Sequence, residues 1–260
     1  MRPADLIPRF LLPPVSALVG ESGGPPDIEE ETGISRAAWV ELGRAFPRLG
    51  ADPGPEAARA RRRFGFLIGR ALDSERHGPV FPRGRPDPAP HVYATAHVGD
   101  LRSLRYLMRR HVPLANIVNA SDADRVHILE RDRLVDAESP HAFPHAFHFR
   151  QPHRLRAALR RGSLLAAVDM PEEEGTEFSC LGGRIRLDAR PFRLARIAGV
   201  PCRAIFLTAP RGRLTISIGP VLPREEGTAL AKFARALERA VDRCPYDIDA
   251  ATWWSRIGRA

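Results

Sequence analysis

The sequence predicts an α/β fold: a single domain with a mixed, mainly parallel central sheet flanked by helices, preceded by a helical and loop-rich N-terminal region. Three observations support this prediction. The chain of 260 residues is long enough to bury one large core. From residue 91 onward, short apolar runs alternate with helical patterns, as strands joined by helical crossovers do. Before residue 91, prolines and glycines interrupt the chain repeatedly, which favours loops.

The N-terminal region, 1–90, contains two predicted helices, at 36–45 and 56–72. Prolines then recur through 78–90, where they remove backbone donors and restrict the residues before them. This stretch is therefore expected to connect the N-terminal region to the α/β domain at 91–260.

The apolar segment 6–20 raises the question of membrane contact. Arg9 and two prolines interrupt it, so its longest uncharged run is too short to span a bilayer. The segment also lacks the basic start and cleavage site of a secretory signal. It is long enough to lie in a membrane interface, which predicts a peripheral contact.

The elements of the α/β domain follow from hydrophobic periodicity. In the last helix, 228–243, the apolar residues Leu230, Phe233 and Leu237 lie opposite Arg235. We interpret this apolar stripe as core packing and not as a lipid groove. The other predicted helices lie at 101–110, 155–159 and 192–197, and the predicted strands at 92–96, 114–118, 163–168, 203–208 and 213–218.

Arginine supplies nearly all of the positive charge. The formal net charge is +9, and Lys232 is the only lysine. Arginine binds phosphates and carboxylates through parallel hydrogen bonds, which suits anionic headgroups, acidic carrier proteins or nucleic acid; codon bias toward arginine is the alternative explanation. The three cysteines, Cys180, Cys202 and Cys244, form no close pair, which argues against a disulfide framework and favours a reducing cytoplasm.

A histidine ends the first predicted strand of the α/β domain. The segment 94–100 reads Ala-Thr-Ala-His-Val-Gly-Asp, and a helix is expected to follow it directly. Functional groups gather at the carboxyl ends of parallel strands, and a glycine such as Gly99 lets a substrate approach the backbone. His97 is therefore a candidate general base. Asp100 either orients the imidazole or caps the helix.

The segment from His97 to Arg102 resembles the first motif of the lysophospholipid acyltransferase superfamily. The closest similarity is to the lauroyl/myristoyl-type acyltransferases of late lipid A biosynthesis, where a strand leads into His-aromatic-Gly-Asn-Trp-Glu. His97 and Gly99 match this motif, whereas Arg102 stands at the position of the family's acid. Either Asp100 replaces that acid, or the chain is a catalytically weakened or silent relative that binds a lipid or an acyl carrier.

A second segment, 157–178, extends the resemblance. A helix and a glycine lead into an apolar strand that ends at Asp169, and Glu174-Gly175-Thr176 is similar to the Glu-Gly-Thr block of glycerolipid acyltransferases. The resemblance implies that these residues bind the acceptor near the histidine. A solvated acidic loop is the alternative interpretation.

A third segment, 181–201, resembles the family's closing block, in which a helix ends in a small-residue turn before the next strand. Gly219-Pro220 and Trp253-Trp254 follow at fitting intervals. The similarity covers roughly residues 90–258, and its specificity lies in the order of the segments.

The resemblance implies direct acyl transfer from acyl carrier protein or acyl-CoA to a hydroxyl or amine of a lipid-like acceptor at the inner face of the cell membrane. His97 would deprotonate the acceptor, and backbone donors near Gly99 would stabilise the oxyanion. This chemistry needs neither a metal nor a bound cofactor. The candidate phosphate-binding residues are Arg150, Arg184, Arg186 and Arg190.

Three other signals are weaker. His141 and His145 have a spacing that zinc ligands use, but Pro144 and nearby phenylalanines favour a packed loop. The segment 20–24 matches the G-x-S-x-G nucleophile motif, but two prolines follow where a helix is needed. The arginines are scattered and no nucleic-acid-binding motif occurs, so no nucleic-acid partner is expected.

Overall fold

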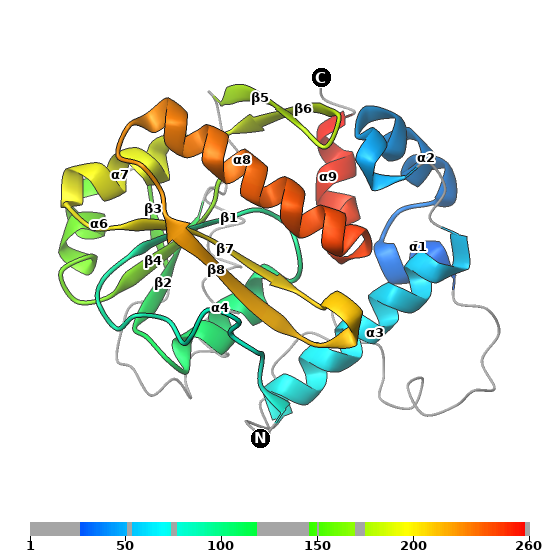
Figure 1. Cartoon of the computed structure of the whole chain (residues 1–260), viewed down its shortest axis with the longest axis horizontal. Helices are drawn as coiled ribbons and strands as arrows, with labels where there is room; N and C mark the ends of the chain where they lie inside the picture. The colour runs from blue at the N-terminus through cyan, green and yellow to red at the C-terminus, as the bar shows by residue number, and fades with distance from the viewer. Residues whose placement is uncertain are drawn as a thin grey trace.

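The computed structural model is an α/β fold, as the sequence predicts. It describes residues 27–50, 54–73, 77–118, 146–149, 151–169 and 175–257. A mixed, mostly parallel sheet forms the centre, and helices cover both of its faces (Figure 1). The segment 6–20, for which a membrane contact was predicted, and the G-x-S-x-G match at 20–24 lie outside the described residues.

The central sheet has six strands in the order β3-β2-β4-β1-β7-β8. All neighbouring pairs are parallel except β7 and β8, which are antiparallel. The carboxyl ends of the five parallel strands therefore meet at one edge, called here the carboxyl edge. The strands are β1 (Val92–Thr95), β2 (Leu114–Val118), β3 (Ala146–His148), β4 (Ser163–Ala167), β7 (Cys202–Thr208) and β8 (Thr215–Val221).

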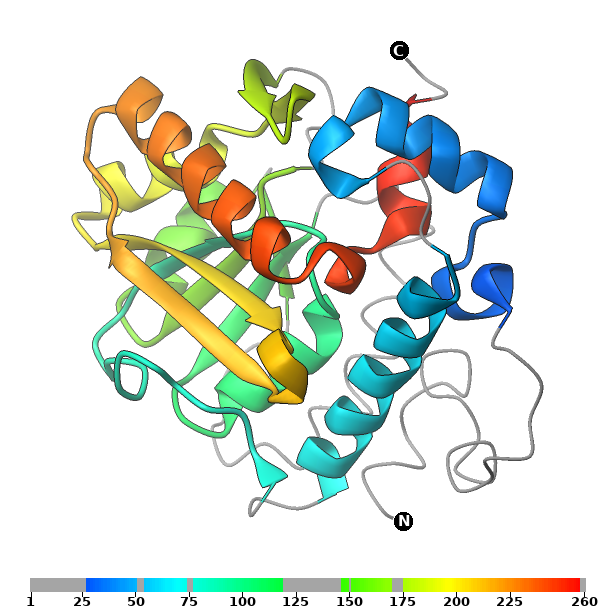
Figure 2. The same cartoon turned by 45° about the vertical axis from the view of Figure 1, so that its right-hand side comes forward.

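Two hydrophobic cores lie on opposite faces of this sheet, because the side chains of each strand alternate between them. On β7, Phe206 joins the first core, and Ile205 and Leu207 join the second. The first core is covered by α6 (Pro152–Ala158), α7 (Arg190–Ala198) and α8 (Glu226–Arg243), and the second by α3 (Gly54–Asp73) and α4 (Leu101–Arg109). Figure 2 shows α8 and α3 on either side of β7 and β8.

The N-terminal helices belong to the same cores as the α/β region. Trp39 of α2 (Arg36–Ala45) is buried with Trp253 of α9 (Ala250–Ile257) in the first core, and Phe64 of α3 is buried in the second. Asp27 caps α1 (Ile28–Thr32) and Ser35 caps α2, each accepting a hydrogen bond from a backbone N–H of the first turn. Short 3-10 turns follow at η3 (Pro47–Leu49), η5 (Pro210–Gly212) and η6 (Pro245–Asp247).

A separate hairpin, which the sequence did not predict, is formed by β5 (Thr176–Cys180) and β6 (Gly183–Leu187). Its turn is Leu181-Gly182, both with positive φ, the geometry of tight two-residue hairpin turns. A Cβ added to Gly183 would overlap the Ala45 carbonyl oxygen, so only glycine allows the hairpin to pack this closely on the end of α2.

In the part of the chain that the structure describes, none of the helices combines the length and the apolar character that crossing a bilayer demands.

We expect Phe233→Ala to lower the free energy of unfolding by about 3–5 kcal/mol, because the ring is fully buried and packs between Phe192 and Phe206. Urea denaturation measures this change. Lys232→Ala, one residue away on the exposed face of α8, is the control and should alter stability by less than about 0.5 kcal/mol. Equal losses in the two variants would contradict this packing.

Candidate active site

His97 lies at the carboxyl edge, two residues after β1 ends. The chain turns sharply there, and the segment 247–249 holds the turn from outside the sheet. The Asp249 N–H donates to the His97 carbonyl oxygen (2.9 Å), and Val98 forms an antiparallel bridge with Ile248. The backbone around the histidine is therefore anchored by a segment distant in sequence.

Asp169 lies beside His97 because β4 is the parallel neighbour of β1 and ends at the same edge. The Val168 N–H donates to the Thr95 carbonyl oxygen, which carries the parallel pairing beyond the strand ends. The Asp169 carboxylate contacts His97 twice: Oδ2 accepts from the backbone N–H (2.9 Å), and Oδ1 lies 3.0 Å from ring Nδ1. The sheet register thus forms a His-Asp pair.

This pair has the geometry of a general base with an orienting acid. The Asp169 side chain is fully buried, whereas the His97 side chain is 21% exposed. A carboxylate can only accept, so the Nδ1 that it faces carries the proton and Nε2 is the basic nitrogen. The buried carboxylate also stabilises the imidazolium that forms when the ring takes up a proton.

Asp100 has a different role from the one expected if it replaced the family's acid. Its carboxylate caps α4, because Oδ1 accepts from the N–H groups of Arg102 (2.8 Å) and Ser103 (3.1 Å). Burial raises its pKa, and the hydrogen bonds from Ser103 and the charge of Arg61 counteract this. Of the two alternatives for Asp100, these contacts are those of the helix cap, and the histidine-orienting contact is made by Asp169.

Gly99 lets the chain pass very close to β7. Its φ is +78°, and a Cβ at this position would overlap the carbonyl oxygen of Leu207. Its N–H donates to the Asp247 carbonyl oxygen (2.5 Å). In this conformation the Gly99 N–H is used within the protein, so it is not one of the backbone donors that were expected near Gly99 for an oxyanion.

Asp247 fixes the turn to the end of β7. Its buried carboxylate accepts from the Ala209 N–H (2.6 Å), and Arg61 of α3 reaches its carbonyl oxygen (3.5 Å). Burial raises the pKa of Asp247. The hydrogen bonds from Ala209 and Cys244 and the charge of Arg61 act in the opposite direction but are smaller effects, so the pKa stays above its ordinary value. Asp247 was not among the sequence candidates. The only sequence feature that indicates a structural role is its position shortly after the helix 228–243.

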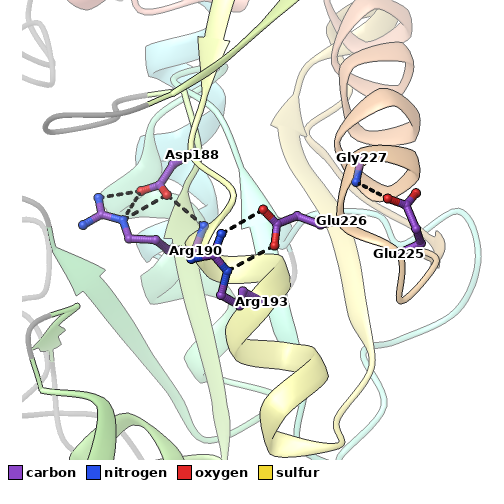
Figure 3. Close-up of polar contacts among 6 residues, drawn as sticks. All are labelled: Asp188, Arg190, Arg193, Glu225, Glu226 and Gly227. Carbon is purple, nitrogen blue, oxygen red and sulfur yellow. Dashed lines mark hydrogen bonds and ion pairs between the residues drawn. The ribbon is translucent and has the colours of Figure 1, made fainter.

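A second buried aspartate, Asp188, contacts the end of β4 next to Asp169 through its backbone. The Asp188 N–H donates to the Val168 carbonyl oxygen (2.6 Å). The Asp188 carboxylate binds Arg190 through Nε (2.9 Å) and Nη2 (2.6 Å), as Figure 3 shows. The Arg190 guanidinium also lies 4.4 Å from the centre of the Phe149 ring. Arg190 is therefore close to the site, but Asp188 already neutralises its charge.

Farther along α7, a second arginine in Figure 3 joins two helices. Arg193 binds Glu226 of α8 through Nε (3.1 Å) and Nη2 (3.0 Å). The neighbouring Glu225 caps α8, and hydrogen bonds from Thr228 and Gly227 lower the pKa of its carboxyl. These contacts stabilise the packing of α7 on α8 and make no contact with His97.

The remaining sequence candidates lie partly on the β5-β6 hairpin and partly outside the described residues. Arg184 and Arg186 are exposed on β6, and Arg184 binds Glu177 across the hairpin (2.6 Å). Thr176 is exposed at the start of β5, directly after Gly175. Arg150, Glu174 and the possible zinc ligands His141 and His145 lie outside the described residues.

A hollow between α6 and α7 is lined by Arg156, Leu159, Arg160 and Ala198. These residues precede the first residues of β4 and β7, so the hollow lies at the opposite edge of the sheet from His97. It is therefore not a binding site for a group that reacts at His97.

No family model matches the chain, and no curated protein matches it in sequence.

We expect Gly99→Ala to lower the free energy of unfolding by more than Gly50→Ala does. Both glycines have positive φ, +78° and +85°, but nothing lies within 4 Å of a Cβ at Gly50. Gly50→Ala should cost about 1 kcal/mol for the backbone conformation alone, and Gly99→Ala about 2–3 kcal/mol because the turn must also move away from β7. Thermal unfolding of both variants measures the difference, and equal losses would contradict the close approach.

We expect Asp247→Asn to make stability less sensitive to pH. The raised pKa means that the folded protein binds this proton more tightly than the unfolded chain does. The stabilisation is fully present below the ordinary aspartate pKa of about 4 and is lost as the pH rises through the raised value. Urea denaturation from about pH 4 to pH 7 should therefore show a smaller decline in Asp247→Asn than in the wild type. Asp73→Asn, at an exposed helix end, should follow the wild type.

Proposed function

We propose that this protein is an acyltransferase that moves a fatty acyl group from a thioester donor to a hydroxyl or amine of a lipid-like acceptor. The observation that carries the proposal is the contact of His97 Nδ1 with the buried carboxylate of Asp169 (3.0 Å). It provides an oriented base at the carboxyl edge of a parallel sheet, where α/β proteins bind substrates. The motif resemblance around His97 points to acyl transfer as the reaction.

In this mechanism, Nε2 of His97 takes the proton of the acceptor as its oxygen or nitrogen attacks the thioester carbonyl carbon. The tetrahedral intermediate then collapses, the carbon–sulfur bond breaks, and the imidazolium returns its proton to the leaving thiolate. Asp169 stays ionised and stabilises the imidazolium. No bond to the protein forms at any stage.

Asp169 takes the role that the family's motif acid has elsewhere, from a neighbouring strand and not from the turn after the histidine. The presence of Arg102 at the motif position therefore does not remove the acid from the site. The proposed reaction is compatible with Arg102 at that position, because an acid orients an imidazole through the hydrogen bond itself, whichever segment of the chain supplies the acid.

Acyl carrier protein and coenzyme A thioesters are the proposed donors, and the inner face of the cell membrane is the proposed place of reaction. Neither donor phosphates nor a pantetheine arm can rely on Arg190 as a free cation, since Asp188 accepts hydrogen bonds from its Nε and Nη2. Exposed arginines elsewhere at the carboxyl edge are better suited to such contacts.

The second candidate function is a catalytically silent relative that binds a lipid or an acyl carrier. The observation in its favour is Gly99, whose N–H is occupied by Asp247 and so does not face an oxyanion. In that case the His97-Asp169 pair would be structural, and removing it would leave binding unchanged.

We expect His97→Ala to lower kcat by about 10²–10⁴-fold, and Asp169→Asn by about 10²-fold or more, with little change in KM. Asp100→Asn is the matched control and should keep kcat within a few-fold, because asparagine also caps helices well. Release of the donor thiol can be followed with a thiol-reactive chromophore over a panel of lipid acceptors. The protein's own thiols should give little background, since burial raises the pKa of Cys180, Cys202 and Cys244 to about 12.

Each variant decides a separate point. Full activity of His97→Ala would overturn the proposal. A loss in Asp100→Asn as large as that in Asp169→Asn would return the role of the acid to Asp100. Donor binding without any turnover by the wild type over the whole panel would favour the silent relative.

A further inference from the structure

The outer face of α3 carries a stripe of cations with an aromatic ring among them. Arg59, Arg63, Phe66 and Arg70 are exposed and follow one another at intervals of three or four residues, so they share one side of the helix. These four residues are called here the arginine stripe. The opposite side of α3, with Phe64 and Ile68, is buried in the second core. The stripe is therefore held rigidly on the surface.

Among the side chains that the structure describes, those of the arginine stripe form no ion pair with a carboxylate. The Glu31 carboxylate on neighbouring α1 is already bound by Arg62, and the exposed Asp73 follows Arg70 by three residues at the end of the helix. By contrast, α8 carries acidic side chains beside its exposed cations. Its Glu238 and Asp242 both bind Arg48 of η3. A merely solvated face would more often mix both signs in this way.

Two further arginines lie beside the arginine stripe, at the carboxyl edge of the sheet. Arg211 and Arg213 are exposed in the turn between β7 and β8, and the Arg63 guanidinium lies against Gly212 of the same turn. Arg211 has a φ of +53°, a conformation that favours glycine or asparagine over a long side chain. Because this turn follows β7, these arginines lie at the same edge as His97.

Phe66 distinguishes the stripe from a purely electrostatic patch. It is 38% exposed, in contrast to buried core phenylalanines such as Phe64, and the Arg70 guanidinium lies 5.7 Å from its ring centre. Aromatic rings flanked by arginines suit the headgroup layer of a membrane, where phosphates surround an apolar interior. The stripe spans about 16 Å along a convex helix, which matches an extended surface and not a small ligand.

From this arrangement we infer that the arginine stripe docks the protein on an anionic lipid surface, with Phe66 entering the headgroup layer and the carboxyl edge of the sheet beside the membrane. The choice of a lipid over another anionic partner rests on the proposed function, because a lipid-like acceptor must reach His97. Vesicle binding itself needs no turnover, so it can be measured independently of catalysis.

The test is cosedimentation of the full chain with vesicles of phosphatidylcholine alone and of phosphatidylcholine mixed equally with phosphatidylglycerol. We expect binding to the mixed vesicles, little binding to the neutral ones, and weaker binding as salt rises. The triple variant Arg59→Gln, Arg63→Gln, Arg70→Gln should bind the mixed vesicles about 100-fold more weakly, at about fivefold for each charge removed.

The matched control is Lys232→Gln, Arg235→Gln, Arg239→Gln, which removes three exposed cations from α8 on the other face of the sheet. It should weaken binding by less than about fivefold, because its charges face away from a membrane docked on α3.

Two single variants separate charge from apolar contact. Phe66→Ala should weaken binding about tenfold and keep that effect at high salt, since it removes apolar contact. Arg211→Gly removes a charge and relieves the positive φ, so it should weaken binding about fivefold without lowering the thermal stability.

Loss of vesicle binding in the α8 control as large as in the stripe variant would overturn the inference, as would equal binding to neutral vesicles. It is also overturned if an oligonucleotide or an acidic protein binds the stripe more tightly than the mixed vesicles at the same salt. The outcome is separable from that of the proposed function. Stripe-dependent vesicle binding with activity unaffected by His97→Ala would retain the docking surface and reject the reaction, and the reverse pattern would do the opposite.

Discussion

The Asp169 carboxylate is the contact on which the candidate site depends. It binds the backbone N–H and the ring of His97 together, so that one side chain fixes both the end of β1 and the orientation of the imidazole. A carboxylate with no exposed surface is costly to bury unless donors surround it. The parallel register of β1 and β4 brings those donors to it, and the Asp188 N–H supports the adjacent carbonyl of Val168. The histidine is consequently held by the sheet itself.

Much of the fold was predictable, because hydrophobic periodicity reports which side of an element is buried. The predicted helix at 36–45 is confirmed without change as α2, and the amphipathic pattern at 228–243 corresponds to α8. The β5-β6 hairpin was not predicted, since its strands alternate weakly and its turn has leucine before glycine, where asparagine or aspartate is the usual signal. β3 was also missed, because three residues are too few to show a period.

The candidate site was predictable in part. The position of His97 at a strand end follows from local sequence, but its partner depends on which strand pairs with β1, and spacing along the chain does not contain that information. Asp100 is near in sequence and Asp169 is near in space, so local reasoning proposed Asp100 as either the orienting acid or the helix cap, and Asp169 only as a residue that binds the acyl acceptor. Both β1 and β4 were predicted as buried strands, each followed by a polar residue. The pair of His97 and Asp169 could therefore have been found by comparing the polar residues that follow the ends of different predicted strands.

The attachment of the His97 turn to segment 247–249 has a consequence for how the protein is made. The histidine leaves the ribosome early, whereas the groups that hold its backbone, the Asp247 carbonyl and the Asp249 N–H, emerge only after every strand of the sheet. Contacts between such distant segments form late, because a long loop must close before they are gained. A nascent chain with most of its core in place would thus still have an unrestrained histidine turn. The proposed activity would then be acquired only when the fold is complete.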